Sequence, residues 1–238
     1  MFVPDLVSAA PVHVCVVYHS AYGHTAKVAQ YIAQGAEQAG ADVHLISVAA
    51  VQWDLLDQAD IIVMGCPTYM GSLTAALKQF MEDSSKRWLA RARQGKLAAG
   101  FTNGGGLSGD KLAVLQQINL FAMQHGMLWA GLPFMPTGRS QHDINRMSSF
   151  LGLMTQSDNA SIEITPPEGD LETARKFGKY LVWSNGIIEL YTETSVYLNL
   201  SVVIYPRNTE HDLTIRLCDS LEDSVLSVKL LICLDYRS

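Results

Sequence analysis

The sequence predicts an α/β fold in which helices cover both faces of a doubly wound parallel β-sheet. Apolar, strand-like segments alternate with segments of helical periodicity through most of the chain, and this order is typical of parallel strands joined by crossover helices. The loops after the first, third and fourth predicted strands are rich in glycine, proline and hydroxyl side chains. Because the carboxyl ends of parallel strands meet at one edge of a sheet, these loops predict a ligand site there.

The first predicted strand covers residues 12–18, an apolar run that is rich in β-branched side chains and short enough to be buried. The helix predicted after it ends near Gly40, because glycine commonly terminates helices. Its apolar residues follow the spacing of an amphipathic helix at Val28, Ile32, Ala36 and Ala39.

The remaining strands and helices alternate along the chain. The third strand, over residues 60–65, is apolar throughout and is therefore expected near the centre of the sheet. The other strands are predicted over residues 42–48, 95–102 and 127–132, and the helices over residues 73–88, 110–125 and 171–183.

The loop after the first strand has the composition of a phosphate-binding turn. Its residues are Ser20, Ala21, Tyr22, Gly23, His24 and Thr25. A helix begins directly after it, so the unpaired N–H groups of the helix favour an anion in the loop. Because the loop contains no Lys or Arg, a single phosphate held by neutral donors is expected. The alternative is a plain helix cap, and the glycine patterns of triphosphate and dinucleotide loops are both absent.

Two further loops are expected at the same edge of the sheet. In the segment 66–72, Pro67 and Gly71 stiffen the backbone and Tyr69 is presented for stacking. The segment 102–109 contains three successive glycines, whose bare backbone a flat ring can approach closely. A mobile turn would explain any one of these loops, but three loops that converge on one crevice favour a ligand site.

Composition limits the functional class. The 238 residues are 48% hydrophobic and 17% charged, with a net charge of −6 and no basic stripe, so nucleic-acid binding is not expected. Cys15, Cys66, Cys218 and Cys233 show no metal-ligand spacing, so no metal site is predicted. Scattered cysteines of this kind are typical of a reducing cytosol.

No targeting or membrane-spanning segment is predicted. Residues 1–11 lack the basic region and long apolar core of a signal peptide. No apolar stretch reaches the roughly 20 residues that a membrane span requires. A cytoplasmic location is therefore expected.

Four motifs in this order resemble the flavodoxin-like superfamily, and above all its WrbA-type NAD(P)H:quinone oxidoreductases. The motifs are residues 18–25 (YHSAYGHT), 65–71 (GCPTYMG), 95–106 and 125–127 (HGM). The resemblance covers residues 12–186 and implies a five-stranded parallel sheet in the order 2-1-3-4-5, with FMN bound at the three loops. It also extends to NADPH-dependent FMN reductases, because Tyr69 and Met70 stand where WrbA proteins usually have Arg and Phe.

The resemblance assigns the FMN contacts residue by residue. The phosphate is assigned to Ser20, Ala21, Tyr22, Gly23, His24 and Thr25. The isoalloxazine ring is assigned to Pro67, Thr68, Tyr69, Met70 and Gly71 on one side and to Thr102, Asn103, Gly104, Gly105 and Gly106 on the other. His125 is assigned to the pyrimidine side or the substrate pocket, and a helix C-terminal role is the alternative. Trp88 resembles a pocket aromatic, and a core position is the alternative.

The same resemblance implies an FMN oxidoreductase that transfers hydride from NADH or NADPH to a quinone at one shared site. His125 and Tyr69 are the candidates for a proton or hydrogen bond to the quinone oxygen. A homodimer or homotetramer is also implied. The alternative is a flavodoxin-type electron carrier without NAD(P)H turnover. Such carriers usually surround the flavin with acidic side chains, whereas residues 67–72 and 102–107 contain none.

The chain is expected to contain a flavodoxin-like FMN-binding domain over residues 12–188 and an extension over residues 189–238 without an assigned role. The extension is rich in strand-like segments, at residues 195–205, 212–218 and 224–234.

Residues 133–170 form a connection that is long for a loop in a compact domain. It is predicted to cover the substrate. Arg139 and Arg146 in this connection are expected to meet a nicotinamide phosphate or to be solvated.

Overall fold

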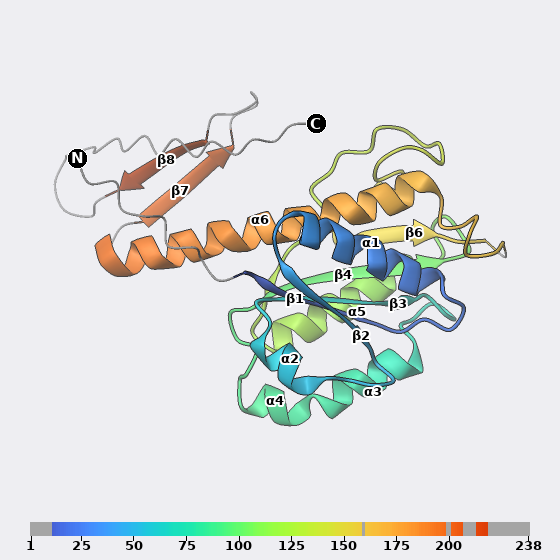
Figure 1. Cartoon of the computed structure of the whole chain (residues 1–238), viewed down its shortest axis with the longest axis horizontal. Helices are drawn as coiled ribbons and strands as arrows, with labels where there is room; N and C mark the ends of the chain where they lie inside the picture. The colour runs from blue at the N-terminus through green and yellow to red at the C-terminus, as the bar shows by residue number, and fades with distance from the viewer. Residues whose placement is uncertain (1–10, 159, 199–200, 207–212, 219–238) are drawn as a thin grey trace. The chain divides into compact units, whose positions relative to one another are not determined.

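The computed structural model describes residues 11–158, 160–198, 201–206 and 213–218 (Figure 1). The chain divides into two compact units, Met1–Asn185 and Gly186–Ser238, and each unit contains its own β-sheet. No helix in the described part of the chain combines the length and the apolar content of a membrane span.

The first unit is built on a parallel sheet with the strand order β2-β1-β3-β4-β5, which confirms the predicted order. The strands are β1 (His13–Tyr18), β2 (Asp42–Ser47), β3 (Ile61–Pro67), β4 (Leu97–Gly104) and β5 (Leu128–Trp129). Every residue of β3 is buried, as expected for a central strand. Because β1, β3 and β4 are parallel, the loops that follow them leave the same edge of the sheet.

The fifth strand differs from the prediction. Only Leu128 and Trp129 form β5, and a further strand, β6 (Leu153–Gln156), pairs in parallel with the second half of β4. The chain leaves β4 because Leu132 bonds to the Phe150 carbonyl instead, and a Cβ on Gly131 would lie 2.4 Å from that oxygen. The predicted strand over residues 127–132 is therefore too long.

The helices are α1 (His24–Gln38), α2 (Trp53–Gln58), α3 (Ala75–Asp83), α4 (Ser85–Leu89), α5 (Lys111–Gln124) and α6 (Glu168–Leu198). The single helix predicted over residues 73–88 is divided into α3 and α4 at Ser84. The Ser84 hydroxyl donates to the Met81 carbonyl at 2.7 Å, a bond to the preceding turn that is typical of serine at a helix end. The short helix α2 was not predicted.

Helices cover both faces of the sheet (Figure 1). On one face, α1 packs backbone to backbone against the first part of α6. A Cβ on Gly35 would lie 1.8 Å from the Arg175 carbonyl oxygen, and one on Gly178 would lie 1.9 Å from that of Ile32. The absence of side chains at Gly35 and Gly178 therefore allows the short distance between the two helix backbones.

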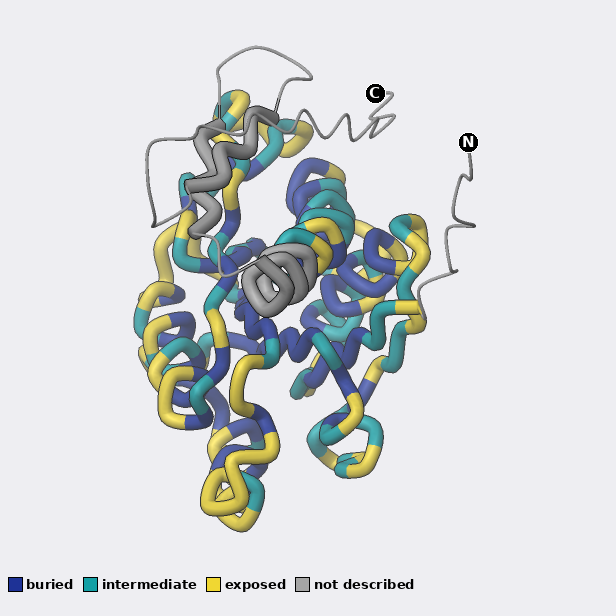
Figure 2. Tube along the Cα trace, turned by 90° about the vertical axis from the view of Figure 1, so that its left-hand side faces the viewer, coloured by how far each residue is buried: buried dark blue, intermediate teal, exposed yellow. Residues whose placement is uncertain are grey.

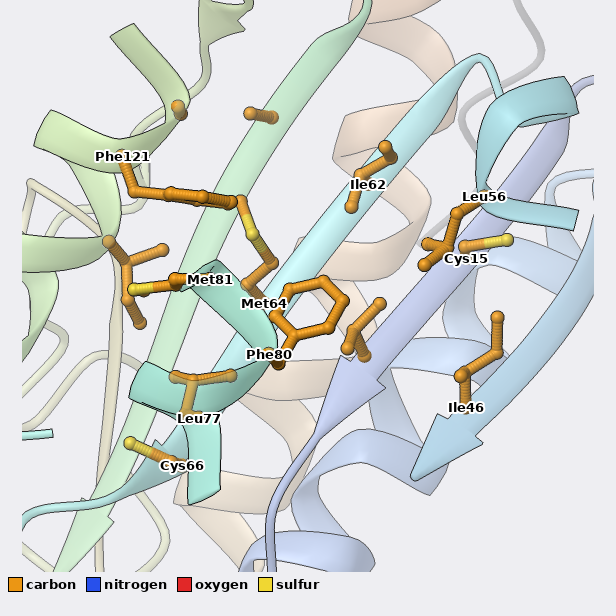
Figure 3. Close-up of a cluster of buried hydrophobic side chains, with 14 of the residues drawn as sticks. Cys15, Ile46, Leu56, Ile62, Met64, Cys66, Leu77, Phe80, Met81 and Phe121 are labelled. Atoms are coloured by element: carbon orange, nitrogen blue, oxygen red, sulfur yellow. The ribbon is translucent and has the colours of Figure 1, made fainter. Parts of the chain in front are cut away.

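The other face of the sheet carries a hydrophobic cluster, in which side chains from the strands meet α2, α3 and α5 (Figure 3). Phe80 of α3 stacks on Trp53 with ring centroids 5.4 Å apart and contacts Phe121 of α5. Buried residues are concentrated along the strands between the helices (Figure 2). The burial of these apolar side chains is the main force that holds the sheet between its helix layers.

The second unit contains an antiparallel pair of strands, β7 (Ser201–Pro206) and β8 (Leu213–Cys218). The strand predicted over residues 212–218 is present. The strand predicted over residues 195–205 is wrong for its first part, because residues 195–198 belong to α6. The strand predicted over residues 224–234 lies outside the described residues.

Candidate functional site

The loop after β1 leaves the N-terminus of α1 open to a ligand. Gly23 has a φ of 89° and precedes the helix, and no side chain caps the first turn. The first helical bond runs from Lys27 N to the Gly23 carbonyl, and the Ser20 hydroxyl accepts from Gly23 N at 3.1 Å. The first-turn N–H groups that precede Lys27 therefore have no partner within the helix, and Thr25 is buried among them. This arrangement favours an anion.

The loop after β3 is closed by a tight turn. Tyr69 and Ser72 exchange two backbone hydrogen bonds of 3.1 and 3.0 Å, and the two central residues, Met70 and Gly71, have φ values of 50° and 74°. Two successive positive φ angles are typical of a type I′ turn. The turn leaves the Met70 side chain fully exposed and the Tyr69 ring 39% exposed.

The loops after β1 and β3 also lie close together. Burial raises the pKa of the Tyr69 phenol above its ordinary value, and the neighbouring Tyr22 phenol adds to the rise. His19 N, at the start of the loop after β1, donates to the Gly65 carbonyl of β3 at 3.0 Å, so the two loops leave neighbouring strands at the same edge of the sheet.

The loops after β3 and β4 are joined by a chain of hydroxyl groups. The Thr102 hydroxyl donates to the Cys66 carbonyl at 2.8 Å, so it must accept from the Thr68 hydroxyl, which also lies 2.8 Å away. Thr68 N donates to the Asn103 carbonyl at 2.8 Å as well. The predicted residues of these two loops therefore do lie side by side.

The Lys111 side chain forms hydrogen bonds with the backbone of the glycine-rich loop. Its Nζ donates to the Gly106 carbonyl at 2.6 Å and to the Leu107 carbonyl at 3.3 Å, and its side chain is fully buried. Burial lowers the pKa of this lysine to about 8, and nearby Asp170 opposes the decrease. A buried cation thus fixes which way two carbonyl groups of the loop point.

The segment after β6 connects the first and third loops. The hydroxyl groups of Thr155 and Ser157 both donate to Asn103 Oδ1, at 2.8 and 3.1 Å. His24 Nε2 donates to the Ala160 carbonyl at 3.0 Å, and Lys27 Nζ donates to the Ile162 carbonyl. His24, a residue of the first loop, therefore binds the segment after β6 to that loop.

A buried ion pair supports the same segment. Arg146 donates to both carboxylate oxygens of Asp170, at 2.7 and 3.2 Å, and also to the Gln156 side chain. Gln156 in turn donates to the Gly105 carbonyl at 2.9 Å. The alternative of a solvated Arg146 is wrong, because its guanidinium is buried against Asp170, and its contact with a nicotinamide phosphate stays a prediction.

Arg139 and Arg146 both line a cavity of about 620 Å³ beside the third loop, together with Leu107, Asp110 and Met154. The connection between β5 and β6 therefore contributes one wall of this cavity, next to the loops that form the candidate site.

His125 and Trp88 lie away from the three loops. His125 is buried at the end of α5, where its Nε2 donates to the Ser84 hydroxyl at 3.0 Å. Lys111, which contacts the third loop, lies at the other end of α5. The 14 residues of this helix span ~21 Å, so His125 is far from that loop. Burial lowers the pKa of His125 to about 4, and the charge of Arg93 adds to the effect. The half-exposed Trp88 belongs to α4, near the same end.

Sequence reasoning missed the supporting residues of the site, namely Lys111, Gln156, Ser157 and Asp170. Lys111 offered one signal, because a lysine in the first turn of a helix is opposed by the helix dipole and therefore needs a local reason. The other three come from segments distant in sequence, and no local pattern marks them.

Comparison with known proteins gives concordant results. A family model described as a flavodoxin domain matches residues 15–125. Flavodoxin FldP of Pseudomonas aeruginosa is 39% identical over 166 residues, which cover 68% of this chain and 90% of that protein. NAD(P)H dehydrogenase (quinone) of Archaeoglobus fulgidus is 28% identical over 191 residues, which cover 70% of this chain and 93% of that protein.

A solved structure shows the same similarity. The flavodoxin, WrbA-like protein from Agrobacterium tumefaciens superposes with a TM-score of 0.60 at 37% identity. The superposition covers 74% of this chain and 98% of that one.

Proposed function

Because the chain belongs to the flavodoxin-like family of the WrbA type, we propose that it binds FMN at the three loops and acts as an NAD(P)H:quinone oxidoreductase. The family itself implies FMN. The choice of NADH or NADPH as donor and of a quinone as acceptor is part of the proposal, and it is supported by relatives such as the Archaeoglobus fulgidus protein.

The donors of the site fit FMN. A phosphate group needs hydrogen-bond donors, and the first loop offers the open N–H groups of α1 beside the hydroxyls of Ser20 and Thr25. A Cβ on Gly104 would lie 3.3 Å from Lys111 Cε and 3.7 Å from Thr68 Cβ, so a larger side chain here would crowd the lysine that bonds to the third loop.

When bound, FMN supplies the two-electron chemistry that connects NAD(P)H to a quinone. The residues of this chain hold and orient the reactants. The Tyr69 phenol is protonated at neutral pH, as any tyrosine with an ordinary or raised pKa is, so it can donate a hydrogen bond to a quinone oxygen. His125 is not included among these residues, since it bonds to Ser84 inside the core.

The apolar surface around the loops is the observation that carries the enzyme proposal. Tyr22, Met70 and Leu107 are 76%, 101% and 62% exposed, and no carboxylate lies within residues 20–25, 67–72 or 102–109. One acidic group at the rim is Asp110, whose carboxylate would lie 3.9 Å from a Cβ on Gly71. An apolar rim suits a small aromatic acceptor better than a basic protein partner, which an acidic rim would attract.

An electron-carrying flavodoxin is the second candidate function. It is favoured by the 39% identity to flavodoxin FldP, which exceeds the 28% identity to the quinone dehydrogenase. The two candidates share the FMN site and differ in whether NAD(P)H reduces the bound flavin directly.

Anaerobic mixing of the flavin-loaded protein with NADH or NADPH tests this difference. The enzyme proposal expects the visible flavin absorption to bleach without an added reductase and to return when a benzoquinone is added. If dithionite bleaches the flavin but neither nucleotide does, the carrier is correct.

A pair of variants makes the test specific to the rim. Leu107→Glu places a negative charge where an anionic nucleotide would approach, and Leu107→Gln has nearly the same shape without the charge. The enzyme proposal expects the Glu variant to be reduced more slowly than the Gln variant, and the difference to shrink as salt is added.

Two further expectations belong to the proposal. Light scattering should show a homodimer or homotetramer. A cytoplasmic location agrees with Cys15 and Cys66, which are free and buried.

A further inference from the structure

One group of His and carboxylate side chains in the described residues converges away from the loop site. It consists of His13, Asp42 and His44. Asp42 Oδ2 lies 3.2 Å from His13 Nδ1 and 3.6 Å from His44 Nε2. One ligand atom from each residue lies within 4.8 Å of the other two.

Strand pairing builds this trio. In the register of β1 and β2, His13 stands beside Asp42, and Cys15 stands beside His44. Residues two apart on a strand share a face, so all three side chains lie on the same side of the sheet. His13 N donates to the Asp60 carboxylate at 2.9 Å, which fixes the start of β1. The three side chains are therefore held together by the sheet itself.

The distances suit a small divalent ion. Bonds of ~2.0–2.2 Å from Zn²⁺ to nitrogen and oxygen ligands place neighbouring ligands of a tetrahedral site ~3.4 Å apart. The distances from Asp42 Oδ2 to the two imidazole nitrogens, 3.2 and 3.6 Å, lie on either side of this value, and the two nitrogens lie within 4.8 Å of each other. The side chains are 34–49% exposed, so water can reach a fourth position.

We propose that His13, Asp42 and His44 form a Zn²⁺ site that links β2 to β1 at the amino edge of the sheet. Two imidazoles and one carboxylate suit zinc better than the all-oxygen sites of magnesium and calcium. β1 rises ~3.3 Å per residue, so His13 lies ~17 Å from Tyr18, where the loop site begins. The ion stabilises the strand pair and has no part in the redox chemistry.

The competing explanation is a hydrogen-bonded cluster in which Asp42 simply accepts from the imidazole rings. Calorimetric titration of the full-length, untagged, chelator-treated protein with ZnCl₂ separates the two. The proposal expects one Zn²⁺ per chain. Asp42→Asn and His44→Ala should each weaken binding at least tenfold, since even the loss of an outer-shell partner commonly costs that much.

His142→Ala is the matched control. His142 forms an exposed pair with Glu168 at 2.9 Å, which resembles half of the proposed site but lacks the second histidine. Its substitution should leave the zinc affinity unchanged. Circular dichroism of each variant checks that the fold is retained.

Two other measurements complete the test. X-ray absorption of the zinc-loaded protein should show nitrogen and oxygen ligands at ~2.0–2.1 Å. Zinc should raise the melting temperature of the wild type but not that of Asp42→Asn. The proposal is overturned if no binding occurs up to ~1 mM zinc, or if folded variants of the trio bind as tightly as the wild type.

Discussion

At the scale of single residues, the third loop depends on Lys111. A buried ammonium group is unfavourable unless its hydrogen bonds are satisfied, and here two loop carbonyls, those of Gly106 and Leu107, accept from it. The same bonds set the direction of the backbone that faces the proposed flavin. The two carbonyl bonds therefore offset the free-energy cost of burying the lysine and also fix the conformation of the third loop.

Lys111→Met should weaken FMN binding about tenfold, because hydrogen bonds to a charged group contribute ~1.5–3 kcal/mol and part of this loss falls on the loop. Fluorescence titration of the apoprotein with FMN measures the change. Lys78→Met is the control, because Lys78 is exposed and, among the described residues, forms an ion pair with Glu82 on α3, away from the loops. An unchanged FMN affinity in Lys111→Met would contradict this account of the loop.

His125 makes stability sensitive to acid. Its pKa is lowered to about 4 in the folded chain, below its ordinary value of ~6.5, so the folded state binds the proton less tightly than the unfolded state. The resulting stabilisation is complete above pH ~6.5 and is lost as the pH falls towards 4, by up to ~3 kcal/mol. Urea unfolding of wild type and His125→Gln should show a smaller loss in the variant. Equal losses in both proteins would refute the assignment.

At the scale of secondary-structure elements, the contact between α1 and α6 depends on the missing side chains of Gly35 and Gly178. The backbones approach so closely that a methyl group at either position would overlap a carbonyl of the other helix. Since α1 begins at the first loop, the position of this helix also determines where its N-terminal N–H groups lie.

Gly178→Ala should therefore destabilise the protein by ~3 kcal/mol, the upper end of the ~1–3 kcal/mol that overpacking typically costs, because the added Cβ would meet backbone. Gly186→Ala is the matched control, because it lies on the same helix with nothing within 4 Å of the added Cβ. The control should be neutral or stabilising by up to ~1 kcal/mol, as alanine is the better helix former. Thermal unfolding followed by circular dichroism compares the two, and equal melting temperatures would contradict the packing argument.

At the scale of the whole molecule, the three loops all belong to the first unit, Met1–Asn185. A chain that ends at residue 188 should therefore bind FMN with a dissociation constant within about twofold of the full chain. Titration of both proteins with FMN measures this. If the shortened chain folds but loses the flavin, the proposed domain boundary is wrong.

The order of the sheet and the three loops could be predicted from the sequence because local patterns encode them. The apolar run of β3 and the glycines after β4 are visible in a few consecutive residues. The break at Ser84 and the early end of β5 could not be predicted in this way. Both involve long-range bonds of the folded chain, between Ser84 and His125 in one case and from Leu132 to the Phe150 carbonyl in the other.

The site was predictable to a similar extent. The loops leave the same edge of the sheet, as expected. The residues that hold them could not be predicted, since the hydroxyl groups that bond to Asn103 lie more than fifty residues away in the sequence. His125 shows the converse limit. The His-Gly-Met motif predicted a place for His125 near the flavin, but His125 stands at the end of α5 that is distant from the loops.

The edge of β4 that β5 and β6 share has an evolutionary consequence. The intervening chain leaves the sheet beside Ala98 and rejoins it beside Phe101, so its two ends are anchored almost at the same place. A change of length within this segment therefore need not shift the pairing of the other strands. Such a change could reshape the cavity wall around Arg139 as long as the buried pair of Arg146 and Asp170 is kept.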